Sequence, residues 1–460
     1  MARNAKKPEV DQEPEGRRGP EEPPRVGPQR AFVVHPHQRK GARDLRRTPE
    51  ASLAEAVGLA GAIGLEVRHA EVVSVQLPNP RTFLGEGRVT TMKGLVAEEK
   101  IDILIFDGPL TGAQQRNLEK ELDCKVIDRT GLILEIFGER ARTREGALQV
   151  ELAALQYQRG RLVRSWTHLE RQRGGFGFLG GPGETQIEAD RRHIDDRIKV
   201  IKRDLDRSKK TRGIHRDNRA RVPWPVVALV GYTNAGKSTL FNRLTKADVL
   251  AADMLFATLD PTMRALELPS GRKAILSDTV GFIADLPTEL VAAFRATLEE
   301  VLQADLILHV RDVAHPDSEA QRDDVLGVLN DLGVTAETQA HAIEILNKID
   351  LLDDDQRRHV ENSAARRSGG AQGQDGPQQA AVSATTGEGT DRLLAAIEEK
   401  LSAGRQIVDL DVPLSDGQMM AWIYAKGVVH ERTDDGDGVA HLKVGLSTAD
   451  LGRFRKRKLA

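Results

Sequence analysis

The sequence predicts an α/β protein whose main domain has a mostly parallel sheet with helices on both faces. Strand-like apolar runs alternate with helical segments from Ala51 to about Glu139 and again from Val226 to Leu401. In addition, the glycine-rich stretch Gly231–Ser238 directly follows the apolar run Val226–Val230. A loop of this kind leaves the first strand of a parallel sheet that binds phosphate groups.

The composition is that of a folded protein, with 460 residues of which 39% are hydrophobic and 30% charged. The net charge is −2, so any binding to nucleic acid would have to come from local patches of positive charge. Cys124 is the only cysteine, which excludes an internal disulfide and favours a reducing compartment. No apolar run has the length of a transmembrane helix. We therefore expect a cytoplasmic protein without a membrane span; a monomeric state and peripheral association with a membrane are further expectations.

The chain divides into five predicted regions, which differ in composition and periodicity. They are a disordered tail over 1–30, an α/β domain over 31–145, a helical hairpin over 146–221, a nucleotide-binding domain over 222–404 and a small α+β domain over 405–460. The tail mixes both charge signs with repeated prolines and has no apolar centre, as disordered segments do. Inside the fourth region, the Gly/Gln/Ser-rich stretch Ser363–Gln379 predicts a flexible surface loop.

Apolar periodicity and turn residues also predict individual elements. In the α/β domain we expect strands at Glu71–Leu77, Ile101–Phe106 and Lys125–Ile127, and helices at Ala51–Ile63, Arg88–Lys100 and Gly112–Leu122. In the last region we expect a strand at Ile407–Val412, a helix at Gln418–Gly427, and two strands within Val428–Leu446 folded around Asp434–Gly438.

The helical hairpin is strongly basic and has a glycine-rich tip. Between Arg159 and Arg221 there are 18 Lys and Arg residues against 9 Asp and Glu, a local surplus of +9. At the tip, Gly174–Gly183, six of ten residues are glycine. A one-signed local surplus predicts RNA binding, with arginines on phosphates and Phe176 or Phe178 against a base. The alternative is a solvated helix pair whose loop only turns the chain.

The stretch Gly231–Ser238 has the pattern GxxxxGK[ST] between a strand and a helix. Its glycines let backbone N–H groups curl around phosphates, and the following helix directs its positive dipole at them. Lys237 is expected to reach the β- and γ-phosphates, and the Ser238 hydroxyl to ligate Mg²⁺. The alternative interpretation is an ordinary glycine-rich turn.

A second motif, Asp278–Gly281, ends an apolar strand with the pattern DxxG. Asp278 can hold Mg²⁺, usually through water, while the N–H of Gly281 faces the γ-phosphate. One further threonine is needed to sense the γ-phosphate and complete the Mg²⁺ shell. We predict Thr258 for this role rather than Thr262, the alternative being that Thr258 only caps a turn.

Two further segments indicate the base. Asn347–Asp350 follows an apolar strand and has the form NKxD. Asp350 can accept hydrogen bonds from N1–H and N2–H₂ of guanine, a donor pair that adenine lacks, and Lys348 can lie along the ring. Ser383 and Ala384 end a short strand, and the N–H of Ala384 is available to guanine O6. All these motifs lie at the carboxyl ends of strands, where such sheets bind ligands. Together they predict a P-loop GTPase domain that hydrolyses GTP.

The catalytic group is expected to comprise Lys237, Asn234, Thr258 and Gly281. Other GTPases orient the attacking water with a Gln just after DxxG. Here that residue is Phe282, which cannot orient water. Asn234 is a possible substitute, because its amide oxygen can hold a monovalent cation such as K⁺ against the phosphates; the alternative is that it only stabilises the loop. The predicted nucleotide-contacting residues are Gly231, Tyr232, Thr233, Asn234, Ala235, Gly236, Lys237, Ser238, Thr239, Phe256, Ala257, Thr258, Asp278, Gly281, Asn347, Lys348, Asp350, Ser383 and Ala384, with Ser238, Thr258 and Asp278 as Mg²⁺ ligands.

With these motifs the chain resembles the HflX family of translational GTPases, from about Ala31 onward. Outside the nucleotide motifs the resemblance is carried by Phe83–Val89, Val126–Phe137 and Gly174–Glu188. It implies a GTPase that binds the 50S ribosomal subunit, with its 23S rRNA and ribosomal proteins, and splits stalled or idle 70S ribosomes under stress such as heat. It also implies that ATP is accepted, and that a hydrophobic residue at Phe282 is compatible with activity.

Two other functions remain open at the level of sequence. A ribosome-assembly GTPase acting on precursor large subunits would be expected to carry a KH-like or glycine-repeat domain, and neither pattern is present. A tRNA-modifying GTPase would be expected to carry a reactive cysteine near its end, whereas Cys124 lies far from it. A metal site at His35 and His37 is not expected, because no matching His/Cys pair accompanies them.

Overall fold

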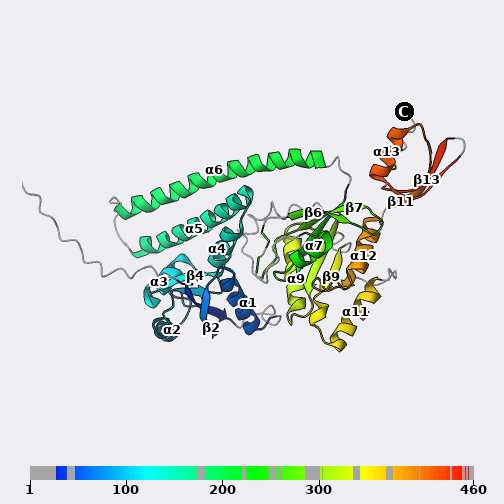
Figure 1. Ribbon diagram of the computed structural model, residues 1–460. Helices are drawn as coiled ribbons and strands as arrows, with labels where there is room; N and C mark the ends of the chain where they lie inside the picture. The colour runs from blue at the N-terminus through cyan, green and yellow to red at the C-terminus, as the bar shows by residue number, and fades with distance from the viewer. Residues whose placement is uncertain are drawn as a thin grey trace, which may run out of the picture.

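The structure is a computed structural model of the chain. It describes residues 27–38, 47–172, 182–219, 224–247, 255–256, 258–259, 262–284, 301–302, 304–334, 342–368, 377–402, 405–435, 438–447, 451 and 454. Within these ranges it describes the backbone alone for residues 162–172, 182–188, 209–219, 405–407, 425–426, 428 and 430. Figure 1 shows two α/β domains next to each other, a long helical hairpin over them and a small domain at the C-terminal end.

The N-terminal domain contains a four-stranded parallel sheet in the order β2-β1-β3-β4. Its elements are β1 (Arg30–His37), α1 (Pro49–Ala62), β2 (Glu66–Ser74), α2 (Glu86–Glu99), β3 (Ile103–Phe106), α3 (Gly112–Leu122), β4 (Lys125–Asp128) and α4 (Arg129–Arg140). The central strands are buried on both faces, as expected for a parallel sheet covered by helices. Phe32 and Val34 pack on one face, and Ala31 and Val33 on the other.

Two elements of this domain were not predicted. Strand β1 includes Arg30, which the prediction placed in the disordered tail, and it also contains Pro36, which argues against a strand in sequence. Helix α4 begins at Arg129 because the Asp128 side chain accepts a hydrogen bond from the Gly131 N–H at 2.9 Å. In addition, β2 starts five residues earlier than the predicted strand Glu71–Leu77.

The hairpin consists of α5 (Arg144–Gln172) and α6 (Pro182–Arg219), as predicted from the apolar spacing. The two helices are antiparallel. Their ion pairs show the register, because Glu151 pairs with Arg197 and the later Arg159 pairs with the earlier Asp195. The predicted tip residues Phe176 and Phe178 lie outside the described residues. In the described part of the chain, every helix is too short or too polar to cross a lipid bilayer.

The G domain contains a six-stranded sheet in the order β10-β9-β8-β5-β7-β6, parallel except for β6. Its elements are β5 (Val226–Gly231), α7 (Lys237–Thr245), β6 (Thr262–Glu267), β7 (Lys273–Asp278), β8 (Leu306–Asp312), α9 (Ser318–Asp331), β9 (Ile343–Asn347), η2 (Ile349–Leu351), α11 (Asp354–Ser368), β10 (Gln378–Ala381) and α12 (Thr390–Ser402). Figure 1 shows helices on both sides of this sheet, which confirms the predicted α/β class.

The predicted loop Ser363–Gln379 is shorter than expected. Helix α11 continues through Ser368, and strand β10 begins at Gln378. The helix continues because Ala364 and Ala365 favour a helix and Ala364 is buried. The serine content of this stretch was therefore misleading.

The small C-terminal domain has a three-stranded antiparallel sheet in the order β11-β13-β12, with its own hydrophobic core. Its elements are β11 (Arg405–Pro413), α13 (Gly417–Lys426), β12 (Val428–Asp434) and β13 (Val439–Ser447). Each predicted element of this region is present within a few residues. The boundaries of the five predicted regions stay a prediction.

Candidate nucleotide-binding site

The phosphate loop runs from the end of β5 to the start of α7. Gly236 precedes the helix with φ +89°, a left-handed conformation in which a side chain would be strained. A Cβ atom at this position would also lie 2.3 Å from Nδ2 of Asn347. Only glycine therefore fits where the loop bends into α7.

Lys237 is buried at the first position of α7. Its Nζ donates hydrogen bonds to the carbonyl oxygens of Tyr232 at 2.7 Å and Gly231 at 3.1 Å. Burial lowers the pKa of Lys237 to about 8, although the negative charge of Asp278 opposes this shift. A phosphate group at this ammonium would favour its charged form.

Ser238, Thr258 and Asp278 converge on one point beside Lys237. The Ser238 Oγ donates to Asp278 Oδ2 at 2.7 Å, Thr258 Oγ1 donates to the same oxygen at 2.9 Å, and the two hydroxyls are 2.8 Å apart. Thr262, the alternative, begins β6 and lies opposite Asp278 in the strand register. Of the two threonines, the structure thus brings Thr258 into hydrogen-bonding contact with the other predicted ligands.

This oxygen cluster has the chemistry of a Mg²⁺ site. Asp278 is fully buried, and its Oδ1 has no hydrogen-bond partner among the described residues. Burial raises the pKa of Asp278, while Lys237, Ser238 and Thr258 oppose the rise. A hard cation bound by carboxylate and hydroxyl oxygens would satisfy the unpaired oxygen and favour the carboxylate. The residues present therefore fit Mg²⁺.

The segment after Asp278 is held against the phosphate loop by backbone hydrogen bonds. The N–H of Phe282 donates to the Gly231 carbonyl at 3.1 Å, and the N–H of Thr233 donates to the Phe282 carbonyl at 2.7 Å. A Cβ atom on Gly281 would lie 2.9 Å from Cγ2 of Thr233, so glycine is needed for this close approach. The Phe282 ring is buried and turned away from solvent, which leaves the backbone of Gly281 as the group next to Lys237.

The base-recognition segments meet at Asn347. Its Nδ2 donates to the Ala235 carbonyl at 2.8 Å, and its Oδ1 accepts the N–H of Ala384 at 3.0 Å. The N–H expected to serve guanine O6 therefore has a protein partner in this structure. Asn347 joins the phosphate loop to the loop that was predicted to contact the base.

The other base residues lie at the same end of the sheet. Asp350 is exposed in the short helix η2, and Lys348 forms an ion pair with Asp312 at 2.8 Å. Ser383 is buried, and its Oγ accepts the N–H of Thr386 at 3.1 Å.

Arg243 is a residue of this site that the sequence did not indicate. From α7 its Nε donates to the Ala384 carbonyl at 3.1 Å, and its Nη2 donates to the Thr385 carbonyl. It thereby ties the base loop to the helix that follows the phosphate loop.

The remaining predicted residues are distributed around the phosphate loop. Asn234 is exposed at φ +58°, whereas Thr233 and Ala235 are buried. Thr239 follows Ser238 in α7. Phe256 is buried two residues before Thr258. Ala257 lies outside the described residues.

His35, for which no metal site was expected, pairs with a carboxylate of the N-terminal domain, and the expectation itself stays a prediction. Its Nδ1 lies 2.7 Å from Oδ2 of Asp107.

Comparison with protein families covers most of the chain. Family models match at 50–138, described as "GTP-binding GTPase N-terminal", at 140–219, "GTP-binding GTPase Middle Region", at 226–348, "50S ribosome-binding GTPase", and at 371–459, "HflX C-terminal domain". The last match includes β10 and α12 of the G domain as well as the small C-terminal domain.

Individual relatives agree with these matches. GTPase HflX of Magnetococcus marinus is 48% identical over 428 residues, covering 93% of this chain and 95% of the relative. GTPase HflX of Escherichia coli is 41% identical over 437 residues, covering 94% and 97%. A crystal structure of a GTP-binding protein from Sulfolobus solfataricus in complex with GDP is 22% identical, with a TM-score of 0.43, and covers 81% of this chain and 99% of that one. The full-length similarity to the first two relatives shows that the chain is a GTP hydrolase and belongs to the HflX family of GTPases.

Proposed function

We propose that this GTPase binds the 50S ribosomal subunit through 23S rRNA and ribosomal proteins and separates stalled or idle 70S ribosomes into subunits. Its use under stress such as heat is part of the same proposal. The observation that carries it is the long basic hairpin, which is built directly onto the domain that contacts the G domain. The match to a family model described as a 50S ribosome-binding GTPase supports the choice of partner.

The hairpin, which we call the arm, is long enough to insert into a narrow space. Helix α5 has 29 residues and α6 has 38, so at about 1.5 Å per residue they extend roughly 40 and 55 Å. Ion pairs between the helices, Arg159 with Asp195 and Arg197 with Glu151, hold them together along part of this length. Such an arm can reach into a narrow, RNA-lined space while the G domain stays outside it.

The base of the arm is anchored on the N-terminal domain. Arg161 of α5 forms an ion pair with Asp128 at the end of β4. A Cβ atom on Gly112, at the start of α3, would lie 3.1 Å from the Arg161 carbonyl, so the two helices approach closely there. The arm and the N-terminal domain are therefore expected to move as one body.

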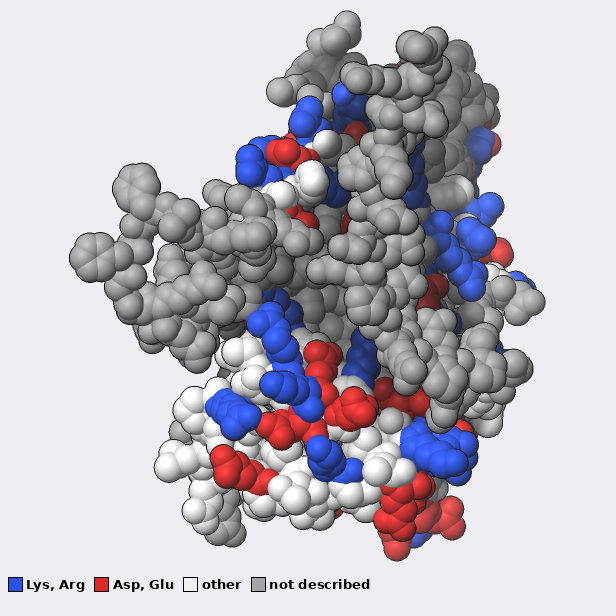
Figure 2. Space-filling model, turned by 90° about the vertical axis from the view of Figure 1, so that its left-hand side faces the viewer, with Lys and Arg blue, Asp and Glu red and all other residues white. Residues whose placement is uncertain are grey.

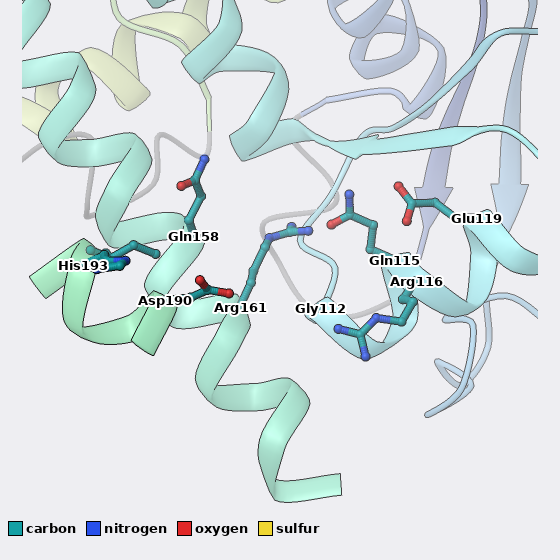
Figure 3. Close-up of a pocket in the computed structure, with 9 residues that line it drawn as sticks. Gly112, Gln115, Arg116, Glu119, Gln158, Arg161, Asp190 and His193 are labelled. Carbon is teal, nitrogen blue, oxygen red and sulfur yellow. The ribbon is translucent and has the colours of Figure 1, made fainter. Parts of the chain in front are cut away.

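A hollow of about 560 Å³ lies where α3, α5 and α6 meet. Figure 3 shows that Gln115 and Arg116 of α3, Gln158 of α5 and His193 of α6 line it, together with the carboxylates of Glu119 and Asp190. Amide, guanidinium and imidazole groups are the ones that bind the edges and phosphates of unstacked nucleotides. We include this hollow in the proposed RNA-binding surface.

The charge of the described surface is mixed rather than uniformly positive. Figure 2, which looks at the left-hand side of Figure 1, shows Lys and Arg interspersed with Asp and Glu. Several cations of the hairpin are paired, as in Lys199 with Asp196 and Arg207 with Asp204. Of the local surplus of +9, +4 falls on residues whose side chains the structure describes and +5 on residues whose side chains it does not describe.

GTP binding and hydrolysis at the nucleotide site would supply the free energy for the proposed cycle. Ser238, Thr258 and Asp278 would hold Mg²⁺, which when bound neutralises charge on the β- and γ-phosphates. Lys237 and the N–H of Gly281 would bind the γ-phosphate, and Asp350 would select guanine. We further propose that Asn234 holds a K⁺ ion beside the phosphates, that ATP is a second substrate, and that the protein is a cytoplasmic monomer with at most peripheral contact with membranes.

The test is light scattering of 70S ribosomes mixed with the protein and GTP. Deleting Gly174–Gly183 and closing the gap with a short turn should leave nucleotide affinity and intrinsic hydrolysis nearly unchanged. It should abolish the fall in scattering that accompanies separation into subunits. A matched control deletes a similar length within 369–376, between α11 and β10, and should split ribosomes normally. Splitting at the full rate by the tip-deleted protein would contradict the proposal.

A further inference from the structure

Helix α4 of the N-terminal domain contacts the two G-domain segments that contain Thr258 and Gly281, the residues predicted to contact the γ-phosphate. We name them the Thr258 segment, residues 255–256 and 258–259, and the Gly281 segment, residues 278–284. The Phe137 ring of α4 packs edge-to-face on Phe256, with ring centroids 4.7 Å apart and an interplanar angle of 77°. At the other end of α4, Nη2 of Arg129 donates to the Ala284 carbonyl at 3.0 Å. Each contact lies within three residues of Thr258 or Gly281.

The N–H of Ala284 is held by Tyr232 of the phosphate loop, whereas its carbonyl is held by Arg129. The Tyr232 hydroxyl accepts the N–H of Ala284 at 2.8 Å and a hydrogen bond from Nη1 of Arg47 at 3.0 Å. Its own proton is donated to Glu55 of α1. A phenol has one proton to donate and can accept two hydrogen bonds, so every bonding position of this hydroxyl is used.

The arginine that holds the Ala284 carbonyl is itself fixed. Its side chain is buried, and it forms ion pairs with Asp107 at 2.6 Å and with Glu55. Glu55 therefore links the two groups that hold Ala284, because it pairs with Arg129 and accepts the proton of Tyr232. The peptide is restrained by a connected set of side chains rather than by one isolated contact.

The Thr258 segment is restrained by packing. Phe256 is 2% exposed and belongs to a hydrophobic core that the two domains share, together with Phe137 and Phe282. Its neighbour Leu255 contacts α1, since a Cβ atom on Gly58 would lie 3.3 Å from Leu255 Cδ1. Both segments thus rest on helices of the N-terminal domain.

We propose that Tyr232, Arg129 and Phe137 are positioning residues for GTP hydrolysis, which act by fixing the Gly281 and Thr258 segments relative to the phosphate loop. The reaction needs the Gly281 N–H and Thr258 at the γ-phosphate. Because Phe282 cannot orient water, the geometry of these backbone segments has a larger share in catalysis. The phosphate loop, Ser238 and the base loop lie within the G domain, so binding of GDP does not depend on these contacts.

The test separates hydrolysis from binding in the full-length protein. Tyr232→Phe removes the hydroxyl that holds Ala284, together with its hydrogen bonds to Arg47 and Glu55, and Phe137→Leu removes the ring that packs on Phe256. Each variant should lower kcat for GTP hydrolysis by about three- to tenfold, corresponding to the loss of the hydrogen bond that holds Ala284 or of the ring contact that holds Phe256. Affinity for a fluorescent GDP analogue should change by less than about twofold, because the two substitutions remove a side-chain hydroxyl and a ring of α4 and leave the backbone of the phosphate loop and the base loop as they are.

Two matched variants control for general damage. Tyr424→Phe removes a hydroxyl that accepts a hydrogen bond from Arg432 at 3.3 Å within the C-terminal domain, and Phe106→Leu removes an edge-to-face ring pair with Phe83 in a separate core. Both should keep the wild-type kcat. The inference is overturned if Tyr232→Phe and Phe137→Leu hydrolyse GTP at the wild-type rate or faster. It is equally overturned if GDP affinity falls in parallel with kcat, or if the control variants lose the same activity. None of these outcomes depends on ribosome splitting.

Discussion

Two buried ionisable groups face each other in the nucleotide site, and burial disfavours the charged form of each. Burial lowers the pKa of Lys237 to about 8 and raises the pKa of Asp278, while each residue partly offsets the shift of the other. Phosphate and Mg²⁺ are the partners that favour the charged forms of both. The site is therefore electrostatically prepared for a metal-bound phosphate at the level of single residues.

Guanine selectivity is predicted to depend on Asp350. Asp350→Asn replaces a carboxylate that accepts two hydrogen bonds with a group that accepts on one side only. GTP binding should weaken by about 2–4 kcal/mol through loss of charge-assisted hydrogen bonds. Xanthine nucleotide, which has a carbonyl where guanine has N2, should bind the variant better than it binds the native protein. Calorimetric titration with both nucleotides checks this, and an unchanged GTP affinity would show that the NKxD assignment is wrong.

Hydrolysis is predicted to be faster in KCl than in NaCl at equal ionic strength. The reason is that Asn234, exposed on the phosphate loop, offers an amide oxygen to a K⁺ ion where no Gln is present to help. Asn234→Ala should remove the difference between the two salts while keeping the slower rate. Steady-state phosphate release in both salts measures this, with and without ribosomes. Equal rates of the native protein in both salts would contradict the prediction.

His309 is predicted to make the G domain less stable in mild acid. Burial lowers its pKa from 6.5 to about 4, and nearby Arg311 adds to this while Glu344 opposes it. A histidine with a depressed folded pKa contributes its full stability above pH 6.5 and loses it as the pH falls toward 4. The free energy of unfolding should fall by about 2 kcal/mol between pH 7 and pH 5 on this account.

Urea unfolding at the two pH values measures that effect. The loss attributable to His309 is the difference between the native protein and His309→Gln, which has no titrating group at this position. If both proteins lose the same stability between pH 7 and pH 5, the buried histidine is not the cause.

Ser238, Asp278 and Asn347 could be predicted because each occupies a fixed offset from the end of a strand, whereas Thr258 was chosen over Thr262 as the threonine that the loop must supply. The structure brings Ser238, Thr258 and Asp278 together, and their role as Mg²⁺ ligands stays a prediction. Arg243 could not be predicted, since its partner Ala384 lies 141 residues away and an arginine inside an amphipathic helix carries no signal of that contact. The same is true of the contacts that Tyr232 makes through its hydroxyl.

At the scale of elements, the hairpin and the small C-terminal sheet followed directly from apolar spacing and turn residues. Strand β1 and helix α4 did not. The sequence of β1 has a proline and two histidines in place of an alternating pattern, and its strand conformation depends on the neighbours β2 and β3. In α4 the apolar residues Leu132–Leu134 and Ile136–Phe137 form nearly continuous runs, which a strand and a buried helix share.

The hairpin is predicted to bind RNA through its arginines. Charge reversal at Arg171 and Arg173, whose side chains lie outside those described, should weaken ribosome binding. The dependence of the logarithm of affinity on the logarithm of salt concentration should become shallower by about two units, because fewer counterions are released. Sedimentation of the protein with ribosomes at several KCl concentrations measures the slope. A parallel shift with an unchanged slope would mean that these arginines do not contact phosphates.

At the scale of the whole molecule, the N-terminal and G domains share one hydrophobic core, whereas the C-terminal domain has a core of its own. The shared core includes Val33 and Leu59 from the first domain and Val230 and Ile307 from the second. This arrangement was not predictable from the sequence, because residues of an interdomain core have the same apolar character as residues of either domain alone.

Ribosome profiles distinguish splitting from assembly for the intact protein. In lysate supplied with a non-hydrolysable GTP analogue, a splitting factor should convert 70S material into free subunits and sediment with mature 50S particles. A ribosome-assembly GTPase would instead accumulate with precursor particles and leave the 70S peak unchanged. We predict the first profile, in line with the proposed function.

The short joint between α4 and α5 allows a movement of the arm to be transmitted to α4. Three residues, 141–143, separate the helices, and both sides are capped: the Ala141 N–H donates to Phe137 O and the Ala147 N–H to Thr143 O, each at 2.9 Å. We expect so short a joint to pass a swing of several ångströms at the end of the roughly 40 Å arm on to α4 as a displacement of about one ångström. Displacements of that size are enough to spoil or complete a reacting geometry. Binding at the far end of the described arm would thus change the rate of GTP hydrolysis through α4.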